Sequence, residues 1–200
     1  MSEAARPRVR LSADARRNMI VAAAFVTIAR DGFEGLRTRD IAALVEINSA
    51  TLHHHFPTKE DLITAVAAEL KRRFQSEKAP GALARSGSAR DALHAQFADA
   101  RHYQAEAPDL LSVYREFLAR APRDPLIRSL VAELNETWRG DIFEILKQAK
   151  WECVLRVNLD PDLAAHILLN AIWGTLMSPG AAPPLDRVEQ QLVNMLFVGD

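Results

Sequence analysis

The chain has 200 residues, of which 48% are hydrophobic and 26% charged, and its formal net charge is −1. This apolar fraction is sufficient for a packed core, and no run approaches the roughly 18 uncharged apolar residues of a membrane span, so we expect none. The single cysteine, Cys153, excludes an intrachain disulfide. The first residues lack the apolar core of a secretory signal, so we expect a cytoplasmic location.

Basic residues are concentrated in the first part of the chain. Residues 1–73 contain 12 Lys and Arg against 9 Asp and Glu, whereas the remainder contains 13 against 17. Arg6, Arg8 and Arg10 precede the first predicted helix. Basic arms of this kind bind along phosphates or in the minor groove of DNA, and the alternative for this segment is a solvated tail.

Apolar residues at helical spacing predict four helices before the first linker. They cover residues 13–30, 39–44, 49–55 and 59 to about 74, with a tight turn over 45–47. Helices as short as the second and third are unstable in isolation, and a protein retains them when one must be presented as a probe. We therefore predict a helix-turn-helix whose second short helix enters the major groove of DNA.

Start and stop signals delimit these helices. Gly32 is a C-terminal stop for the first helix, and Thr38, or the residue before it, caps the second. Asn48 stands where the third helix needs an N-cap, because its side chain accepts an amide of the first turn. Thr58 to Asp61 form a capping box for the fourth helix, whose N-terminus attracts anions.

The two short helices have distinct inner and outer sides. Ile41 and Leu44, with Ala42, face inward on the first, and Leu52 and Phe56 anchor the second. The outer residues of the second are small or hydrogen-bonding, as a groove-entering face requires. For base edges we predict Asn48, Ser49, Ala50, Thr51 and His54, and for phosphates Arg37, Thr38, Arg39, His53 and Lys59. The alternatives are that Thr38 and Asn48 act only as caps and that Ala50 is merely small enough to fit.

The second part of the chain shows five further helical patterns after a linker over 76–88. Aspartate followed by proline opens the third and fourth of them, a cap with proline at the first helical position. No alternating pattern of a β-strand is present, so the chain is predicted to be all-α. The predicted helices cover 89–104, 108–119, 125–150 and 161–177, and a last one follows Pro183-Pro184.

The predicted helix over 161–177 is apolar nearly all round and must be covered on both sides. Its small residues allow a neighbouring helix to approach closely, so we predict a homodimer through a four-helix bundle, with two helices from each subunit. The alternative is burial within the monomer. The predicted interface residues are Ile167, Ala171, Gly174, Val188, Leu192 and Met195.

Signatures of an enzyme are absent from the sequence: there is no nucleophile elbow, His-Glu-x-x-His motif, phosphate loop or dinucleotide fingerprint. We therefore expect neither catalysis nor a cofactor. The run His53-His54-His55 does not predict a metal site, because consecutive helical residues point about 100° apart and cannot converge on one ion.

The N-terminal segment resembles the DNA-binding domain of tetracycline-repressor-like (TetR) regulators. Three residues depart from the family pattern: Glu46 replaces the usual turn glycine, His53 the usual tyrosine, and Arg37 the usual Ser or Thr cap. A left-handed Glu46 would cost about 1 kcal/mol. The matching segments are residues 20–24, Gly32-Phe33, 39–42, 50–56 and 57–62.

The resemblance implies an arm and helix-turn-helix DNA-binding domain over residues 1–60, with the helix-turn-helix at about 37–56, and a connecting helix over 59–75. Residues 76–200 would form a helical bundle for ligand binding and dimerisation. The implied function is a ligand-responsive regulator, a repressor that binds a palindromic operator as a homodimer and is released by a small-molecule effector. The alternatives are an activator or a corepressor-dependent regulator, and a helical protein-interaction module without DNA binding.

The family binds effectors between helices equivalent to those predicted over 89–150, and polar or aromatic residues lie on inward-looking faces there. A ligand pocket is usually mostly apolar with a few polar groups. The alternative is ordinary core aromatics and surface charges. The candidate pocket residues are His94, Phe97, Arg101, His102, Tyr103, Tyr114, Phe117, Trp138 and Phe143.

Overall fold

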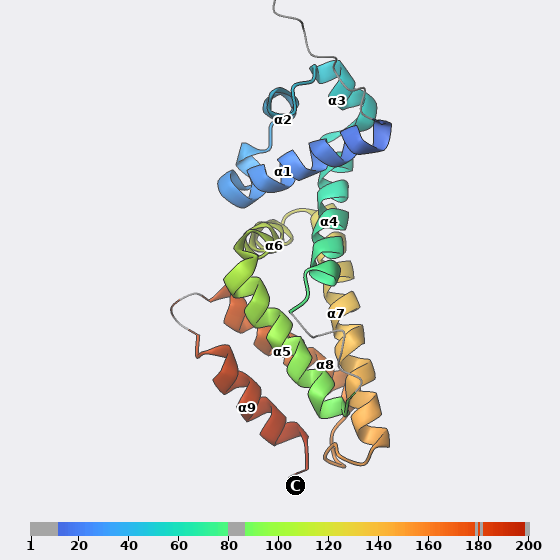
Figure 1. Cartoon of the computed structure of the whole chain (residues 1–200), viewed down its shortest axis with the longest axis vertical. Helices are drawn as coiled ribbons and strands as arrows, with labels where there is room; N and C mark the ends of the chain where they lie inside the picture. The colour runs from blue at the N-terminus through green and yellow to red at the C-terminus, as the bar shows by residue number, and fades with distance from the viewer. Residues whose placement is uncertain (1–11, 80–86, 179, 181, 199–200) are drawn as a thin grey trace, which may run out of the picture. The chain divides into compact units, whose positions relative to one another are not determined.

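The computed structural model describes residues 12–79, 87–178, 180 and 182–198, and these are organised as helices (Figure 1). The predicted all-α class is confirmed; outside the helices, Leu155 and Phe197 form an isolated β-bridge. The helices are α1 (Ala13–Gly35), α2 (Thr38–Leu44), α3 (Ser49–His55), α4 (Lys59–Ser76), α5 (Ala89–Glu106), α6 (Pro108–Arg120), α7 (Pro125–Trp151), α8 (Pro161–Met177) and α9 (Leu185–Leu196).

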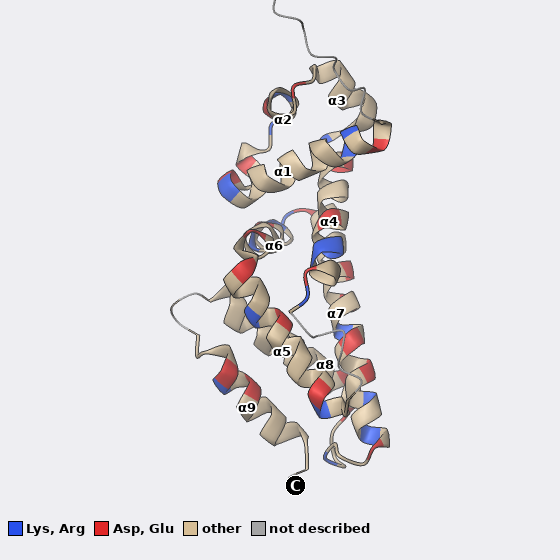
Figure 2. Cartoon of the chain, in the orientation of Figure 1, with Lys and Arg blue, Asp and Glu red and all other residues tan. Residues whose placement is uncertain are grey.

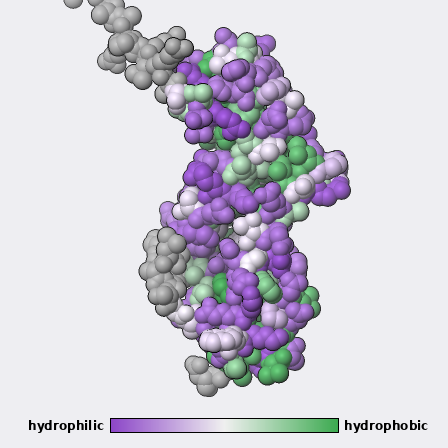
Figure 3. Space-filling view, turned by 90° about the vertical axis from the view of Figure 1, so that its right-hand side faces the viewer, coloured by the Kyte–Doolittle hydropathy of each residue, from purple (hydrophilic) through white to green (hydrophobic). Residues whose placement is uncertain are grey.

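The chain divides into two compact units, one up to Glu69 and one from Leu70 onward. The division falls inside α4, before the linker over 76–88; the sequence predicts a domain boundary within or just before that linker. Within the described ranges, no helix has the length and apolarity that crossing a bilayer requires. On the face drawn in Figure 3, hydrophobic residues form separate patches among predominantly hydrophilic ones.

The first unit is built on α1, which packs against α2, and α2 in turn packs against α3. The helix does not end at Gly32 as predicted but kinks there. Gly32 has φ 67°, which glycine adopts readily, and the chain then resumes helical geometry as far as Gly35. Side chains that are 0–1% exposed fill the centre of this unit: Ile20, Ala24, Phe25, Ile28, Leu36, Ile41, Leu52, Phe56, Leu62 and Val66.

At the start of α2, Arg37 occupies the cap position, which is the second of the two predicted alternatives, but its side chain makes no cap hydrogen bond. Leu44, expected to face inward, is 61% exposed, because Ile41, Ala42 and Val45 already fill the inner side. The loss of a side-chain cap leaves the first amides of α2 to water or a ligand.

The second unit contains α5 to α9, in which α7 packs on α8, α5 and α6, and α5 also packs on α9. Its start signals are confirmed: Asp124 Oδ1 accepts from the amides of Leu126 (3.1 Å) and Ile127 (3.3 Å), and Asp160 Oδ1 accepts from the amide of Asp162 (2.9 Å). These capped starts fix where the long α7 and the apolar α8 enter the bundle. The core includes Leu93, Phe97, Tyr114, Phe117, Ile127, Ile142, Leu146, Ala165, Leu168 and Ile172.

Candidate functional site

The turn between α2 and α3 is tight and closed by backbone hydrogen bonds. The amide of Val45 donates to the carbonyl of Ile41 (3.2 Å), and that of Ile47 donates to the carbonyl of Ala42 (2.9 Å). Between them, Glu46 is left-handed at φ 54°, as anticipated for the position where the family has glycine. A strained non-glycine residue therefore sets the direction in which α3 leaves the turn.

The inner side of α3 is firmly anchored. Asn48 Oδ1 accepts from the Thr51 amide at 2.7 Å, which confirms the predicted N-cap. Leu52 is 0% exposed and Phe56 1%, and the guanidinium carbon of Arg17 lies 4.6 Å from the centre of the Phe56 ring. These contacts hold a helix of seven residues that would not persist alone.

The outer side of α3 is accessible. Asn48, Ser49, Ala50, His53 and His54 are exposed and Thr51 is half-buried. None of the ten predicted DNA-contacting residues is buried, since Arg37 and Arg39 are exposed and Thr38 and Lys59 half-buried. The described first unit thus presents small, hydrogen-bonding side chains outward from a supported short helix, which is the form of a groove-entering element.

Groups suited to phosphate lie around this face. The capping box of α4 is confirmed, with Thr58 Oγ1 accepting from the Asp61 amide (3.1 Å) and Asp61 Oδ2 accepting from the Thr58 amide (3.0 Å). Lys59 lies in the first turn of the same helix. Basic residues occur at both ends of α1 (Figure 2), and Arg30 at its C-terminal end is paired with Asp31. Arg6, Arg8 and Arg10 lie outside the described residues.

A cavity of about 40 Å³ lies in the second unit, between α4, α5, α7 and α8. It has room for about three water molecules. Of the predicted pocket residues, Tyr103 and Trp138 line it. The complete lining is Lys71, Phe74, Gln75, Lys78, Tyr103, Leu134, Thr137, Trp138, Asp141 and Trp173.

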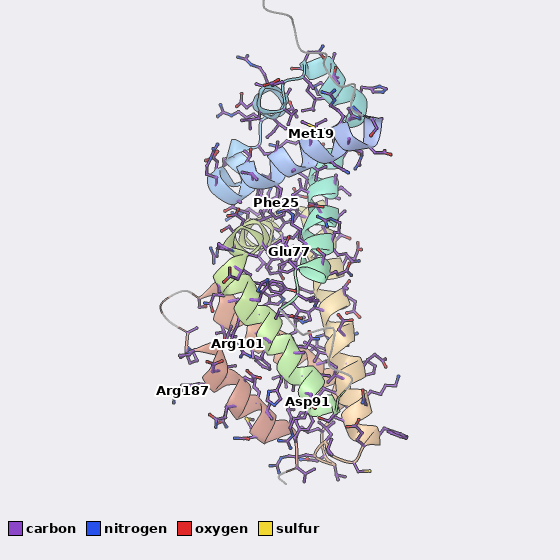
Figure 4. The ribbon with its side chains drawn as sticks, in the orientation of Figure 1. Met19, Phe25, Glu77, Asp91, Arg101 and Arg187 are labelled. Atoms are coloured by element: carbon purple, nitrogen blue, oxygen red, sulfur yellow. The ribbon has the colours of Figure 1, made fainter. Side chains whose placement is uncertain are left out.

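His94 and Arg101 do not reach this cavity. His94 Nδ1 lies 2.5 Å from Glu189 Oε1, and the Arg101 guanidinium pairs with Glu189 and with Asp186 Oδ1 (2.9 Å). Arg101, labelled in Figure 4, therefore lies on the side of α5 that faces α9. The structure therefore does not bring these two predicted pocket residues to the cavity, because they pair with carboxylates of α9.

The remaining pocket candidates are also placed elsewhere. Phe97 and Phe117 are completely buried in the core, and Tyr114 donates its hydroxyl to Asn135 Oδ1 at 2.6 Å. His102 is half-buried next to Tyr103, with ring centres 6.3 Å apart. Phe143 lies under the cationic ends of Arg139 and Lys147, each 5.9 Å from its ring centre.

Aromatic side chains form the wall of the cavity. The ring centres of Trp138 and Trp173 are 4.9 Å apart, those of Phe74 and Tyr103 5.1 Å, and those of Phe74 and Trp173 5.8 Å, all in edge-to-face geometry. Tyr114 stacks on Trp173, with ring centres 4.0 Å apart. No sequence pattern predicts this grouping, because Phe74 stands near the end of α4 and Trp173 among the apolar residues of α8.

The charged residues at the cavity are mostly paired. Lys71 Nζ lies 2.8 Å from Glu133 Oε1, and Lys78 Nζ lies 3.1 Å from the buried Asp99 Oδ2. Desolvation raises the pKa of Asp141 and the ammonium of Lys78 partly opposes that rise. Burial raises the pKa of Tyr103, with a further contribution from Asp99, so this hydroxyl stays protonated and donates to the Phe74 carbonyl at 2.6 Å.

Apolar residues of α8 and α9 remain uncovered. Ile167 and Met195, both predicted at a dimer interface, are 53% and 56% exposed, and Leu163 is 60% exposed. A Cβ at Gly174 would meet no heavy atom within 4 Å beyond its chain neighbours and the backbone of its own helix. An open hollow of about 640 Å³ runs along the same face and is lined by Ala171, Pro183, Arg187, Val188, Gln190, Gln191, Leu192 and Asn194.

Known proteins resemble this chain in sequence and in fold. The model of a family described as bacterial regulatory proteins, tetR family, matches residues 20–66. The HTH-type transcriptional repressor KstR2 of Rhodococcus jostii is 24% identical over 196 residues, which cover 92% of this chain and 90% of the relative. A transcriptional regulator of Saccharomonospora viridis in complex with choline has a TM-score of 0.74 at 24% identity, covering 94% of this chain and 100% of that one. A TetR transcription regulator of Haloarcula marismortui has a TM-score of 0.78 at 19% identity, covering 92% and 100%.

Proposed function

We propose that this chain, which belongs to the TetR family of bacterial regulatory proteins, is a repressor that binds a palindromic operator as a homodimer and is released by a small-molecule effector. The family consists of DNA-binding transcriptional regulators and not of enzymes. The observation that carries the proposal is α3, whose inner side is anchored by Leu52 and whose outer side is accessible.

DNA binding would divide between two groups of residues. A seven-residue helix offers few base contacts, so phosphate contacts must supply much of the affinity. We assign phosphates to Arg37, Thr38, Arg39, His53 and Lys59 and base edges to Asn48, Ser49, Ala50, Thr51 and His54. The exposure of both groups supports this division. Asn48 uses only its Oδ1 atom for the cap, so the two N–H donors on its Nδ2 atom are available to a base edge.

The homodimer would form through the exposed apolar face of α8 and α9. Leu163, Ile167, Ala171 and Gly174 recur at spacings of three or four residues, and so form one stripe along α8. Val188, Leu192 and Met195 form the corresponding stripe on α9. A second copy of the chain suits this face because a two-fold axis brings two such pairs together and presents two α3 helices to the two halves of a palindrome.

Effector control would act through α4. This helix begins three residues after α3 ends and contributes Lys71, Phe74 and Gln75 to the cavity. A ligand that displaces α4 in the cavity therefore has a covalent route to the helix-turn-helix. Relatives named as repressors and a choline-bound neighbour support regulation of this kind in a cytoplasmic DNA-binding protein.

Selection of bound fragments from a random DNA pool tests the proposal. We expect a palindrome with half-sites about one helical turn apart, bound with a steep salt dependence. The variant Ala50→Glu, which places a carboxylate on the outer face of α3, should abolish enrichment, whereas Ala132→Glu on exposed α7 should not. Failure of the unaltered protein to enrich any sequence would favour the protein-interaction module.

A further inference from the structure

The indole N–H of Trp173 has no hydrogen-bond acceptor in the part of the chain that the structure describes, although the nitrogen is buried. The other indole at the cavity, that of Trp138, donates to Gln96 Oε1 at 2.7 Å. A buried donor without an acceptor costs free energy, and such groups are uncommon in native proteins. Of the two tryptophans that line the cavity, only Trp138 donates its indole N–H to an acceptor within the described residues.

The surroundings of this donor favour a flat, apolar molecule. Phe74 and Trp138 stand edge-to-face to Trp173, and Tyr103 stands edge-to-face to Phe74 and to Trp138, so that ring edges and faces form one part of the cavity lining. Leu134 adds an apolar side chain to the lining. Aromatic walls of this type bind planar rings by stacking and edge contacts.

The charges of the lining disfavour an ionic ligand. Lys71 and Lys78 are each paired with a carboxylate, of Glu133 and Asp99 respectively, so they offer no uncompensated positive charge to an anion. Asp141 would repel an anion further. A cation would gain from the aromatic faces and from Asp141, but a cation without a lone pair cannot accept the Trp173 N–H bond.

We propose that the effector is an uncharged planar ring compound whose carbonyl oxygen accepts a hydrogen bond from Trp173 Nε1. The inference rests on the proposed function, because it specifies the chemistry of the ligand that would regulate DNA binding. The present volume of about 40 Å³ does not admit a whole ring, and Trp173 Nε1 is itself buried in this state. The ring therefore displaces residues of α4 that border the cavity, Lys71 and Gln75, which are the residues through which the effector would move that helix.

Four compounds with the same phenyl ring test the chemistry on the purified full-length chain: acetophenone, α-methylstyrene, benzoate and phenyltrimethylammonium. They present a neutral carbonyl, a hydrocarbon of the same shape, an anion and a cation. We expect acetophenone to bind best by isothermal titration calorimetry, at least about ten-fold more tightly than α-methylstyrene, which lacks the acceptor. Tightest binding of either ion, equal binding of acetophenone and α-methylstyrene, or no saturable binding of any of the four overturns the proposal.

A matched pair of variants tests the residue. Trp173→Phe keeps a ring but removes the unpaired donor, and should abolish the preference for acetophenone over α-methylstyrene. Trp138→Phe removes a donor already bonded to Gln96 and should retain that preference. Without ligand, Trp173→Phe should melt no lower than Trp138→Phe, because only the latter leaves the half-buried acceptor Gln96 Oε1 without its donor. A preference that survives in Trp173→Phe, or a lower melting temperature for it, contradicts the assignment.

These measurements are made without DNA, so they separate this inference from the proposed function. If the unaltered chain enriches a palindrome but shows none of the expected ligand preferences, the ligand assignment alone is wrong. If the ligand preferences appear but no DNA is enriched, the cavity assignment stands and the regulator function is wrong.

Discussion

Replacing Glu46 with glycine should stabilise the first unit. Glu46 has φ 54°, a conformation that costs a side-chain-bearing residue about 1–2 kcal/mol and costs glycine almost nothing. Against this gain, glycine adds conformational entropy to the unfolded chain, worth about 0.5–1 kcal/mol. Because the Glu46 side chain is exposed and no packing is lost, we expect a net increase of about 0.5–1 kcal/mol in the free energy of unfolding.

The matched control is Glu46→Ala, which removes the same carboxylate but keeps a Cβ at the left-handed position. Urea unfolding followed by circular dichroism measures both variants, and the midpoint should rise for glycine only. DNA affinity serves as a second readout, since removal of a negative charge beside α3 should strengthen binding equally in the two variants. If alanine proves as stable as glycine, the strain assigned to this turn is not present in solution.

Three further experiments address DNA contacts, assembly and the cavity. Lys59→Ala should weaken binding to all DNA sequences and reduce the slope of log affinity against log salt by about 0.9. Ser49→Ala should instead change the sequence preference. Equal effects of both variants on random DNA would contradict the division into phosphate and base contacts. Ile167→Asp should produce monomers in analytical ultracentrifugation. Its control, Val157→Asp, lies at a site that is 98% exposed between α7 and α8 and should leave the dimer intact. A dimeric Ile167→Asp variant would argue against this interface. Asp141→Asn should raise the free energy of unfolding at neutral pH, because a raised carboxyl pKa means that folding disfavours the ionised form. In thermal scans this gain should disappear as the pH falls through the raised pKa toward about 4, where the unfolded carboxyl is also protonated. A gain that is constant with pH would mean that the charge of Asp141 is not its source.

The helices were predictable because their signals are local. Asn48, Asp124 and Asp160 each cap a helix within three residues of themselves, and the short α3 was delimited correctly at both ends. The left-handed turn at Glu46 could also be anticipated, because a resemblance that places glycine there implies a positive φ. Where a local signal was misread, at Leu44, the deciding factor was which neighbours had already filled the core.

The cavity was not predictable because its lining comes from four helices and is selected by long-range pairing. His94 and Arg101 are polar residues of the kind that line ligand pockets. They pair instead with Glu189 and Asp186, which lie more than 80 positions further along the chain. Phe74 and Trp173 look like ordinary core residues, yet they border the space that the second unit leaves open. Pattern reasoning identifies residues that suit a pocket, whereas packing decides which of them reach one.

The apolar character of α8 reflects several requirements placed on one helix. Leu168 and Ile172 pack in the core, Trp173 borders the cavity, and Ile167 lies on the exposed stripe. At 100° per residue, Ile167 and Trp173 are separated by about 120° around the helix axis, so the stripe and the cavity occupy different sides of α8. A change at Ile167 should therefore break the dimer without altering the preference for acetophenone, and a change at Trp173 should do the reverse. Loss of both properties in either variant would mean that α8 itself unfolds, because two separate faces of an intact helix have no other reason to fail together.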